Sequence, residues 1–287
     1  MKHRVRHFIC IALFFPFASG ASAQSVTKDI EFAHTGAYAL KLDLHLPKQA
    51  NPPLIVYVHG GAWLAGSKSD VPITKLLDHG FAIASVEYRL STQAQFPAQA
   101  HDIKAAIRFL RAKSEALHIN TRRIAIIGSS AGGHLAALVG VTNGHKELEG
   151  TVGGHLDQSS DVQGIVSLYG ASNLQSILSQ STETGLKMRV PALQRLLGAQ
   201  PLEKPELAKL ASPVAHLDKN DPPLLLIHGD ADPQMPPQQS EEFAKAYEAA
   251  GLPVKLVILH GAKHGGGVFY DEERTQLVAG FLDKALR

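Results

Sequence analysis

The stretch RIAIIGSSAGGHLAALVG (Arg123–Gly140) consists of two apolar segments separated by two serines and a run of small residues. This change of pattern is typical of a strand that turns sharply into a helix. In the nucleophile elbow, G-x-S-x-G, small residues flank the serine because larger side chains would clash in the turn. Centred on Ser130, the pattern finds Gly128 and Gly132 in place, whereas centred on Ser129 it finds no glycine at either position. We therefore expect Ser130 to be the candidate nucleophile and Ser129 to be a neighbour that caps or hydrogen-bonds.

Other loops that join a strand to a helix fit this stretch less well. A G-x-G-x-x-G phosphate loop would need a glycine where Ser130 stands, and a Walker loop would need a lysine after its second glycine. A serine-rich turn without catalytic function remains the alternative. The choice between the two depends on whether the rest of the chain supplies partners for a reactive serine.

The pattern around this stretch alternates between strand and helix. The first expected strand alternates polar and apolar residues, and the later ones are short apolar runs, as in a parallel sheet that is buried on both faces. The expected strands are Lys41–Leu46, Pro53–His59, Phe81–Tyr88, Arg123–Gly128, Val162–Gly170, Pro223–Gly229 and Val254–Gly261. Helical spacing and end signals predict helices over Pro97–Leu117, Pro237–Gly251 and Asp271–Arg287. The sequence therefore predicts one α/β domain with a mostly parallel sheet.

One segment departs from this alternation. Residues 171–216 have no strand pattern and contain four prolines, and they are too many for an ordinary connection. We expect a small helical excursion near the carboxyl edge of the sheet. Its two possible roles are packing and a partial lid over a pocket.

A serine hydroxyl needs a base, usually histidine, and an acid that orients the base. In an α/β fold with a nucleophile elbow, the acid follows a late strand and the histidine follows the last one. The first of these loops offers Asp230 and Asp232, and the second offers His260 and His264. We expect Asp232 and His264 to act, because both stand off from the strand ends. Asp230 is expected to fix its turn.

The negative oxygen of an acyl-transfer intermediate needs preorganised N–H donors. One donor is expected from Ala131, directly after the nucleophile. The others are expected from Gly61 and Ala62 in VYVHGGAW, where glycine lets the backbone approach a substrate closely. Trp63 is a candidate for lining the acyl or alcohol pocket, although packing is an equal alternative.

Together these segments resemble an α/β-hydrolase of the esterase and lipase type, related to the hormone-sensitive-lipase group and closest to bacterial carboxylesterases of the feruloyl-esterase and acetyl-xylan-esterase type. The resemblance spans almost the whole chain after residue 23. It is carried by LDLHLP (Leu42–Pro47), VHGGAWLAGSK (Val58–Lys68), VEYRL (Val86–Leu90), GSSAGGHLAAL (Gly128–Leu138), ASPV (Ala211–Val214), HGDADPQMP (His228–Pro236) and GAKHGGG (Gly261–Gly267).

This resemblance implies an eight-stranded, mostly parallel sheet with helices on both faces. The family's triad falls on Ser130, Asp232 and His264, and its oxyanion hole falls on the N–H groups of Gly61, Ala62 and Ala131. One departure is Ala62, which stands where the hormone-sensitive-lipase group commonly has a third glycine. HGGAW also resembles the motif of arylformamidases, so an amide substrate is an alternative.

The first 23 residues are expected to be a secretory signal peptide. Residues 1–7 carry three basic side chains, residues 8–18 form an apolar run, and Ala21 and Ala23 complete a small-residue cleavage site. A membrane anchor is the alternative, but a spanning helix needs about 20 apolar residues. We expect cleavage after Ala23, a single domain over 24–287, and a secreted or periplasmic protein without a membrane span.

Loss of the leader changes the composition. It would remove three of the 28 Lys and Arg residues and none of the 26 Asp and Glu residues, so the formal charge would change from +2 to −1. No basic patch then argues for a nucleic-acid partner. The leader also contains the single cysteine, so the mature chain has no thiol for a disulfide or a metal. The histidines show no metal-ligand spacing, and we expect neither a metal nor an organic cofactor.

We therefore expect a serine carboxylesterase that acts on a small, aromatic or carbohydrate-linked ester of the acetyl or feruloyl type. The rivals are an arylformamidase-like amide hydrolase, a peptidase, and a non-catalytic binding module that has kept the fold. The sequence leaves the natural ester, the lid conformation and the oligomeric state open.

Overall fold

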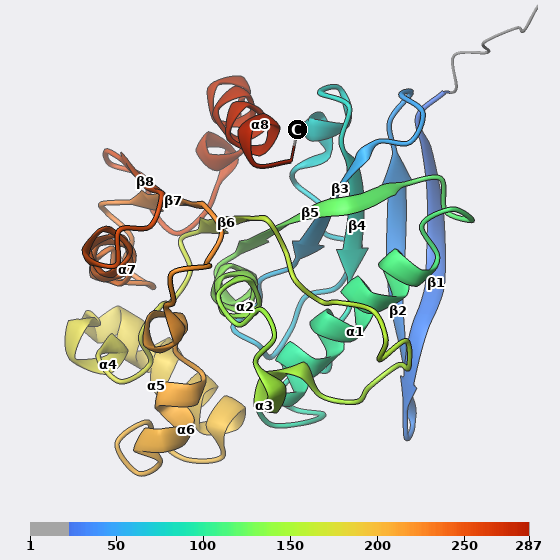
Figure 1. Cartoon of the computed structure of the whole chain (residues 1–287). Coiled ribbons are helices and arrows are strands. Elements are labelled where there is room, and N and C mark those ends of the chain that lie inside the picture. The colour runs from blue at the N-terminus through green and yellow to red at the C-terminus, as the bar shows by residue number, and fades with distance from the viewer. Residues whose placement is uncertain (1–22, 287) are drawn as a thin grey trace, which may run out of the picture.

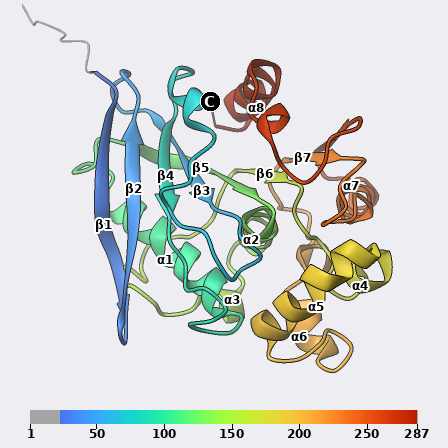
Figure 2. The same ribbon diagram turned by 180° about the vertical axis from the view of Figure 1, so that it is seen from behind.

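The architecture is an eight-stranded sheet with helices on both faces, seen from opposite sides in Figures 1 and 2. A computed structural model describes residues 23–286, so the expected signal peptide lies outside the described residues except for Ala23. The strands are β1 (Ser25–Thr35), β2 (Tyr38–Leu46), β3 (Pro53–Val58), β4 (Ala82–Val86), β5 (Asn120–Ser129), β6 (Gly164–Leu168), β7 (Leu224–Gly229) and β8 (Val254–Leu259). Within this part of the chain, no helix has the length and apolar character that crossing a membrane requires.

The strand order is β1-β2-β4-β3-β5-β6-β7-β8. The pairs β1–β2 and β2–β4 are antiparallel, and every later pair is parallel. Strands β3, β4 and β6 lie inside the sheet and are almost wholly buried, as their continuous apolar runs predict. The expectation of a mostly parallel, eight-stranded sheet is confirmed. The six parallel strands, β3 to β8, have their carboxyl ends at one edge of the sheet.

Strand β1 is the one strand that no sequence pattern indicated. It is an edge strand and is largely exposed, so a continuous apolar run is not required of it. Its pairing with β2 shifts register at two places, between Thr27 and Ile30 and again between Glu31 and Ala33. Each irregularity interrupts the alternation of apolar and polar residues by which a strand is recognised.

The helices form a layer on each face of the sheet. They are α1 (Ala98–Ala112), α2 (Ala131–Gly140), α3 (Lys146–Glu149), α4 (Ile177–Gln180), α5 (Glu183–Leu197), α6 (Pro205–Leu210), α7 (Gln238–Ala249) and α8 (Glu272–Leu286), with 3-10 turns η1 (Thr74–Leu77), η2 (Pro213–His216) and η3 (Gly267–Phe269). Helices α1, α2 and α7 share one hydrophobic core with the sheet, and α8 and η1 share a second core on the opposite face. The three long helices predicted from spacing are α1, α7 and α8.

The segment 171–216 is a helical excursion, as expected, and contains α4, α5, α6 and η2 without a strand. These helices lie together beside α7, on the side of the sheet away from β1, in both Figures 1 and 2. The side chain of Gln239 in α7 fixes the start of the excursion, because its Oε1 accepts hydrogen bonds of 2.8 Å from the backbone N–H groups of Ser172 and Asn173.

A buried ion pair joins the loop after β4 to α1. The guanidinium of Arg89 donates two hydrogen bonds, of 2.8 and 2.7 Å, to the carboxylate of Asp102, whose side chain is fully buried. The backbone N–H of Arg89 donates a third, of 2.9 Å, to the same carboxylate. Every contact joins one structural element to another, so the pair positions α1 on the sheet.

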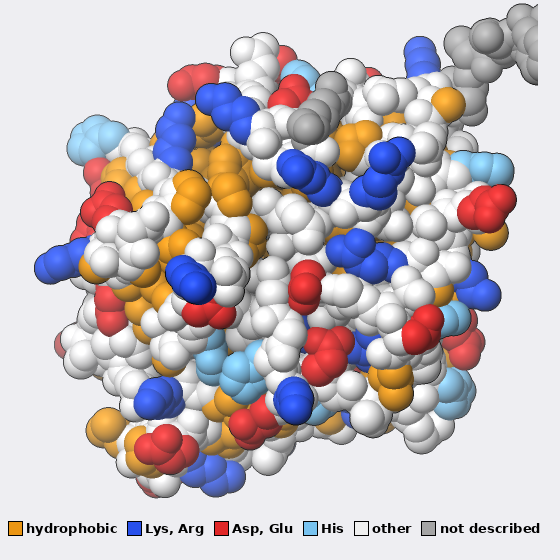
Figure 3. All heavy atoms as spheres, in the orientation of Figure 1, with side chains coloured by type: hydrophobic (Ala, Val, Ile, Leu, Met, Phe, Trp, Pro, Cys, Tyr) orange, Lys and Arg blue, Asp and Glu red, His pale blue; other side chains and the backbone are white. Residues whose placement is uncertain are grey.

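The edge of the sheet farthest from β1 is less well covered by helices than the centre of the sheet. In Figure 3, hydrophobic side chains gather between α7 and α8, over the edge that β7 and β8 form. Strand β8 is the edge strand there, and its residues are mostly half-buried or exposed. The edge therefore differs from the parallel centre of the sheet, where both faces are covered.

Candidate active site

Ser130 lies at the turn between β5 and α2 in a backbone conformation that non-glycine residues rarely adopt. Its φ is 54° and its ψ is −119°, which costs of the order of 1–3 kcal/mol and lifts the side chain out of the helix. The glycines are required by packing: a Cβ atom on Gly128 would lie 2.1 Å from the carbonyl oxygen of Gly132, and one on Gly132 would lie 2.1 Å from that of Val58. Strand, turn and helix therefore have the geometry that the G-x-S-x-G pattern predicts.

The structure brings Ser130, His264 and Asp232 into one line of hydrogen bonds. Ser130 Oγ lies 2.8 Å from His264 Nε2, and His264 Nδ1 lies 2.6 Å from Asp232 Oδ2. A carboxylate can only accept, so Nδ1 carries the proton and Nε2 is free to accept from the serine hydroxyl. The three residues follow β5, β7 and β8, whose carboxyl ends meet at the same edge of the sheet.

The carboxylate of Asp232 is fully buried and accepts from several donors. Its Oδ1 accepts from the backbone N–H groups of Gln234 and Met235 at 2.8 and 2.9 Å, and its Oδ2 also lies 3.4 Å from His228 Nε2. Burial by itself raises the pKa of Asp232, but the hydrogen bonds from His228 and His264 outweigh burial and hold the pKa well below its ordinary value. Asp232 is therefore ionised at neutral pH and can orient the ring of His264.

The loop after β3 runs directly beside Ser130. A Cβ atom on Gly60 would lie 2.9 Å from the carbonyl oxygen of Ser129. Gly61 has a φ of 107° and Ala62 a φ of 53°, so an alanine occupies a left-handed conformation that favours glycine. Ala131 is the first residue of α2, and the first N–H groups of a helix have no partner within it. Gly61 and Ala62 line the same cavity as Ser130, and Ala131 directly follows it. The role of their N–H groups as oxyanion donors stays a prediction.

These segments enclose a cavity of about 550 Å³, which we call the Ser130 cavity. Sites for small molecules commonly measure about 300–1,000 Å³. The cavity is lined by Gly60, Gly61, Ala62, Leu64, Ala65, Gly66, Asp70, Ser129, Ser130, Tyr169, Met188, Arg189, Gln234, His264 and Gly265. Two of these residues, Met188 and Arg189, belong to α5, so the excursion forms part of the cavity wall.

The suggestion that Trp63 lines the pocket is wrong. Its side chain is fully buried and does not reach the Ser130 cavity. The indole Nε1–H donates a hydrogen bond of 3.2 Å to His134 Nδ1, and His134 Nε2 donates one of 2.7 Å to the carbonyl oxygen of Ala211. Because a buried indole must satisfy its N–H, Trp63 packs inward and joins the loop after β3 to α2. Packing, the alternative that the sequence left open for Trp63, is the correct interpretation.

Sequence reasoning missed several residues of the cavity wall. Tyr169 directly follows β6 at the carboxyl edge, and its ring meets that of His264 edge-on, with centroids 4.9 Å apart. Its place after a strand is a signal that could have been used. Met188 and Arg189 gave no such signal, because a helix in an excursion can present any of its faces to the cavity.

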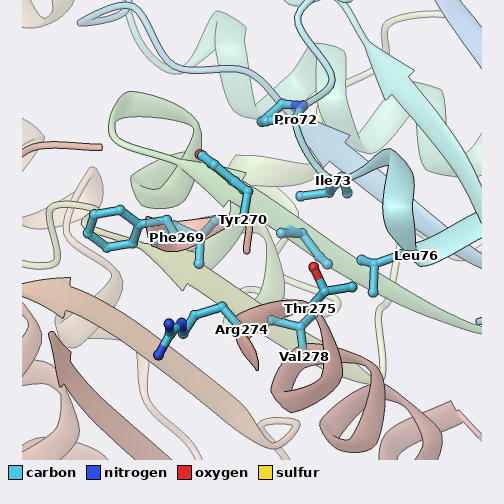
Figure 4. Close-up of a pocket in the computed structure, with 10 residues that line it drawn as sticks. Pro72, Ile73, Leu76, Phe269, Tyr270, Arg274, Thr275 and Val278 are labelled. Atoms are coloured by element: carbon cyan, nitrogen blue, oxygen red, sulfur yellow. The ribbon is translucent and has the colours of Figure 1, made fainter. Parts of the chain in front are cut away.

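A second, smaller cavity lies between η1 and α8 and is shown in Figure 4. Its wall is mainly apolar and includes Ile73, Leu76 and Val278. It offers only about 20 Å³, room for about one water molecule and for no substrate. Tyr270 lines it and shares a hydrogen bond of 2.5 Å with the hydroxyl of Tyr169, so this cavity lies behind the Ser130 cavity.

The sequence of this chain matches a known protein family. A model of the BD-FAE family matches residues 42–247, which is more than half of the chain. The chain belongs to the BD-FAE family of α/β-hydrolase esterases. Among residues 23–286 of this family member, no three His, Cys, Asp or Glu side chains come together as metal ligands would.

Curated relatives of this BD-FAE chain carry esterase names. Esterase LipC of Mycobacterium tuberculosis is 31% identical over 218 residues, which cover 74% of this chain and 53% of LipC. The ethyl acetate hydrolase of Pseudomonas putida is 28% identical over 274 residues, covering 86% of this chain and 77% of that enzyme. The chain spans about half the length of LipC and of several other esterases that it matches.

Solved structures agree with the fold. A truncated carbohydrate esterase from gut microbiota superposes with a TM-score of 0.84 at 31% identity, covering 93% of this chain and 98% of that one. An acetyl ester-xyloside bifunctional hydrolase from Caldicellulosiruptor lactoaceticus gives a TM-score of 0.71 at 26% identity, covering 87% and 89%. The predicted resemblance to esterases of the α/β-hydrolase fold is confirmed.

Proposed function

We propose that this protein is a serine carboxylesterase that hydrolyses a small, aromatic or carbohydrate-linked carboxylic ester through an acyl-enzyme. The observation that carries the proposal is the line of hydrogen bonds from Ser130 through His264 to the buried Asp232, at the wall of a cavity large enough for such an ester. The esterase names of the relatives support the reaction class, and the carbohydrate esterase among the structural neighbours supports the substrate class.

In the first half of the reaction, Ser130 Oγ attacks the ester carbonyl while its proton passes to His264 Nε2. Asp232 stabilises the resulting imidazolium and holds the ring in the right tautomer. The carbonyl oxygen becomes negative and is stabilised by the N–H groups of Gly61, Ala62 and Ala131. The bond to the alkoxy oxygen then breaks, His264 gives its proton to the leaving alcohol, and the acyl group stays on Ser130.

In the second half, water takes the place of the alcohol. It attacks the acyl carbon while His264 Nε2 takes one of its protons. The bond to Ser130 Oγ then breaks and His264 returns the proton to the serine. The carboxylic acid leaves, and the enzyme regains its starting state. The proton transfers between Ser130 and His264 run along the hydrogen bond that already joins Oγ to Nε2, while the bond from Nδ1 to Asp232 holds the ring in place.

The proposal is tested by Ser130→Ala against Ser129→Ala. The first variant should lose about 10⁴-fold or more of its activity on 4-nitrophenyl acetate and should no longer be labelled by an organophosphate. The second should keep most of its activity, because the hydroxyl of Ser129 shares its hydrogen bond of 3.1 Å with the hydroxyl of Tyr57 and, within the described residues, forms none with Ser130, His264 or Asp232. Retained activity in Ser130→Ala with an unchanged circular dichroism spectrum would contradict the assignment.

The identity of the preferred ester is tested with a panel of substrates. Acetylated xylan, methyl ferulate and short-chain nitrophenyl esters represent the proposed classes, and formylkynurenine represents the amide alternative. Preference for an acetyl or feruloyl ester supports the finer proposal. A clear preference for formylkynurenine would replace it.

We also propose that the protein is exported with loss of residues 1–23. The basic head, apolar run and small-residue cleavage site in the sequence support this proposal. N-terminal sequencing of the protein from a cell envelope fraction should begin at Gln24. An intact Met1 in cytosolic protein would contradict export.

A further inference from the structure

Arg189 is a buried cation in the wall of the Ser130 cavity with few partners. Its side chain is only 2% exposed. One nitrogen, Nη2, donates a hydrogen bond of 2.9 Å to the carbonyl oxygen of Gln234. Its Nε is buried without a hydrogen-bond partner, and among residues 23–286 no carboxylate lies within ion-pair distance of the guanidinium. The indole of Trp63 lies against it, with Cζ 5.8 Å from the ring centroid.

This arrangement is energetically unusual. Buried charges in proteins are normally paired or fully hydrogen-bonded, because removing a charge from water is costly. Burial lowers the pKa of Arg189 to about 10, partly offset by the charge of Asp232, so the guanidinium remains protonated at neutral pH. Asp232 does not act as its partner, since its oxygens already accept from His264, two backbone N–H groups and His228.

The other buried arginines and lysines of the chain show the contrast. Arg108 and Lys104 are also buried, but both contact the carboxylate of Glu149. Lys68 is buried as well, and its ammonium pairs with the carboxylates of Asp43 and Asp29. Arg189 differs from these three in two ways: it has no carboxylate partner within the described chain, and it lines the same cavity as Ser130 and His264.

We propose that Arg189 is a specificity-determining residue that binds a carboxylate of the substrate, so that the enzyme prefers esters that carry a second, free carboxylate. The proposal rests on the esterase function proposed above. A carboxylate suits the site because a planar guanidinium binds it with two parallel hydrogen bonds. It would supply the negative charge that the protein itself does not place beside Arg189.

The other charged group of the cavity wall limits where that carboxylate can lie. Asp70 also lines the cavity, but it is exposed and belongs to the loop between β3 and η1, whereas Arg189 belongs to α5. A substrate carboxylate would be attracted to the α5 side and repelled from Asp70. Removing the charge with Asp70→Asn should therefore raise activity on an anionic ester relative to a neutral one.

A structural role for Arg189 is the competing explanation. Its bond to the carbonyl oxygen of Gln234 holds the loop that carries Asp232, two residues away. A purely structural role would lower activity on all esters by the same factor. Binding of a carboxylate would change the ratio between an anionic and a neutral ester.

The experiment measures kcat/KM on two matched pairs of esters. The first pair, 4-carboxyphenyl acetate and 4-carbamoylphenyl acetate, carries the group on the alcohol side. The second pair, monomethyl terephthalate and methyl 4-carbamoylbenzoate, carries it on the acyl side. The wild type should prefer the carboxylate in at least one pair by about tenfold or more. Arg189→Met should abolish that preference, and Arg189→Lys should keep part of it.

The control is Lys187→Gln, which removes one positive charge from the same helix at an exposed position that does not line the cavity. It should leave the ratio unchanged. No preference in the wild type for either pair, or an equal loss on both members of a pair in Arg189→Met, would overturn the proposal. A wild type inactive on all four esters and on 4-nitrophenyl acetate would instead indicate failure of the proposed esterase function.

A measurement on the wild type keeps the proposal testable if Arg189→Met does not fold. Benzoate and benzamide have the same shape and differ in charge, and both can compete with 4-nitrophenyl acetate. Benzoate should inhibit about tenfold more strongly than benzamide. Equal inhibition by the two compounds would contradict carboxylate binding.

Discussion

Two Asp–His pairs stand in the same two loops of this protein, and only one of them lies beside the serine. Asp230 and Asp232 both follow β7, and His260 and His264 both follow β8. The distances from Nδ1 to Oδ2 are 2.7 Å in the pair Asp230–His260 and 2.6 Å in the pair Asp232–His264. Geometry of the pair alone therefore does not distinguish them.

Burial and the third partner make the difference. The side chains of Asp230 and His260 are 37% and 98% exposed, whereas those of Asp232 and His264 are 0% and 12% exposed. Asp230 also accepts from the backbone N–H of Gly261 at 2.7 Å, so it joins the two loops, as expected of a residue that fixes its turn. A hydrogen bond that water can replace contributes little to stability. The same bond in a buried site, from which water is excluded, is stronger and can hold a base in one orientation.

The largest expected effect tests this contrast at the histidines. His264→Ala removes the group that accepts the proton of Ser130 and should lower kcat on 4-nitrophenyl acetate by about 10⁴-fold or more. His260→Ala removes an equally well-formed hydrogen bond on the surface and should leave kcat and KM unchanged. Steady-state kinetics on both purified variants makes the comparison. A large loss in His260→Ala would show that the exposed pair takes part in the reaction.

A smaller loss is expected at the acids. Asp232→Asn keeps the shape of the side chain but no longer fixes the tautomer or stabilises the imidazolium, and should lower kcat by about 10³–10⁴-fold. Asp230→Asn should have no measurable effect on kcat. If Asp232→Asn retained wild-type kcat, His264 would not depend on a carboxylate for its orientation. The two acids would then not differ in their effect on the reaction.

Much of this site could be predicted because its residues are tied to strand ends. The register of G-x-S-x-G selected Ser130, and the distance of Asp232 and His264 from their strands selected them over Asp230 and His260. Their hydrogen bonds in the structure agree with that selection, while their catalytic roles remain predictions. Parallel strands end at the same edge of the sheet, and this fixes where the following loops begin. A residue a few positions after a strand end can therefore be assigned to the site from the sequence.

The rest could not be predicted because it depends on packing between distant segments. Trp63 stands in the loop that borders Ser130, yet it faces inward because His134, on another element, accepts its N–H. Arg189 reaches the cavity from an excursion whose helices no strand register constrains. Strand β1 was missed because its irregular pairing disrupts the alternation on which sequence reasoning relies.

The smallest expected effect concerns stability in acid. The pKa of Asp232 in the folded protein lies well below its ordinary value of about 3.9, so the ionised carboxylate stabilises the fold above that pH. This contribution is lost as the pH falls below about 4 toward the lower folded pKa. Asp232→Asn lacks a titrating group at this position, so the difference in unfolding free energy between the wild type and this variant should narrow from pH 7 to pH 3.

Urea unfolding of both proteins at pH 7, 5, 4 and 3 measures that difference, and Asp230→Asn is the matched control. Hydrogen bonds from His260 and Gly261 also lower the pKa of Asp230, but its carboxylate is exposed to solvent that replaces those bonds readily. The control should therefore follow the wild type at every pH. Two results would contradict this expectation: a difference in unfolding free energy from the wild type that stays constant with pH for Asp232→Asn, or one that narrows equally for Asp230→Asn. Either result would mean that burial does not make the two Asp–His pairs differ in their contribution to stability. The contrast between them would then rest only on their distance from Ser130.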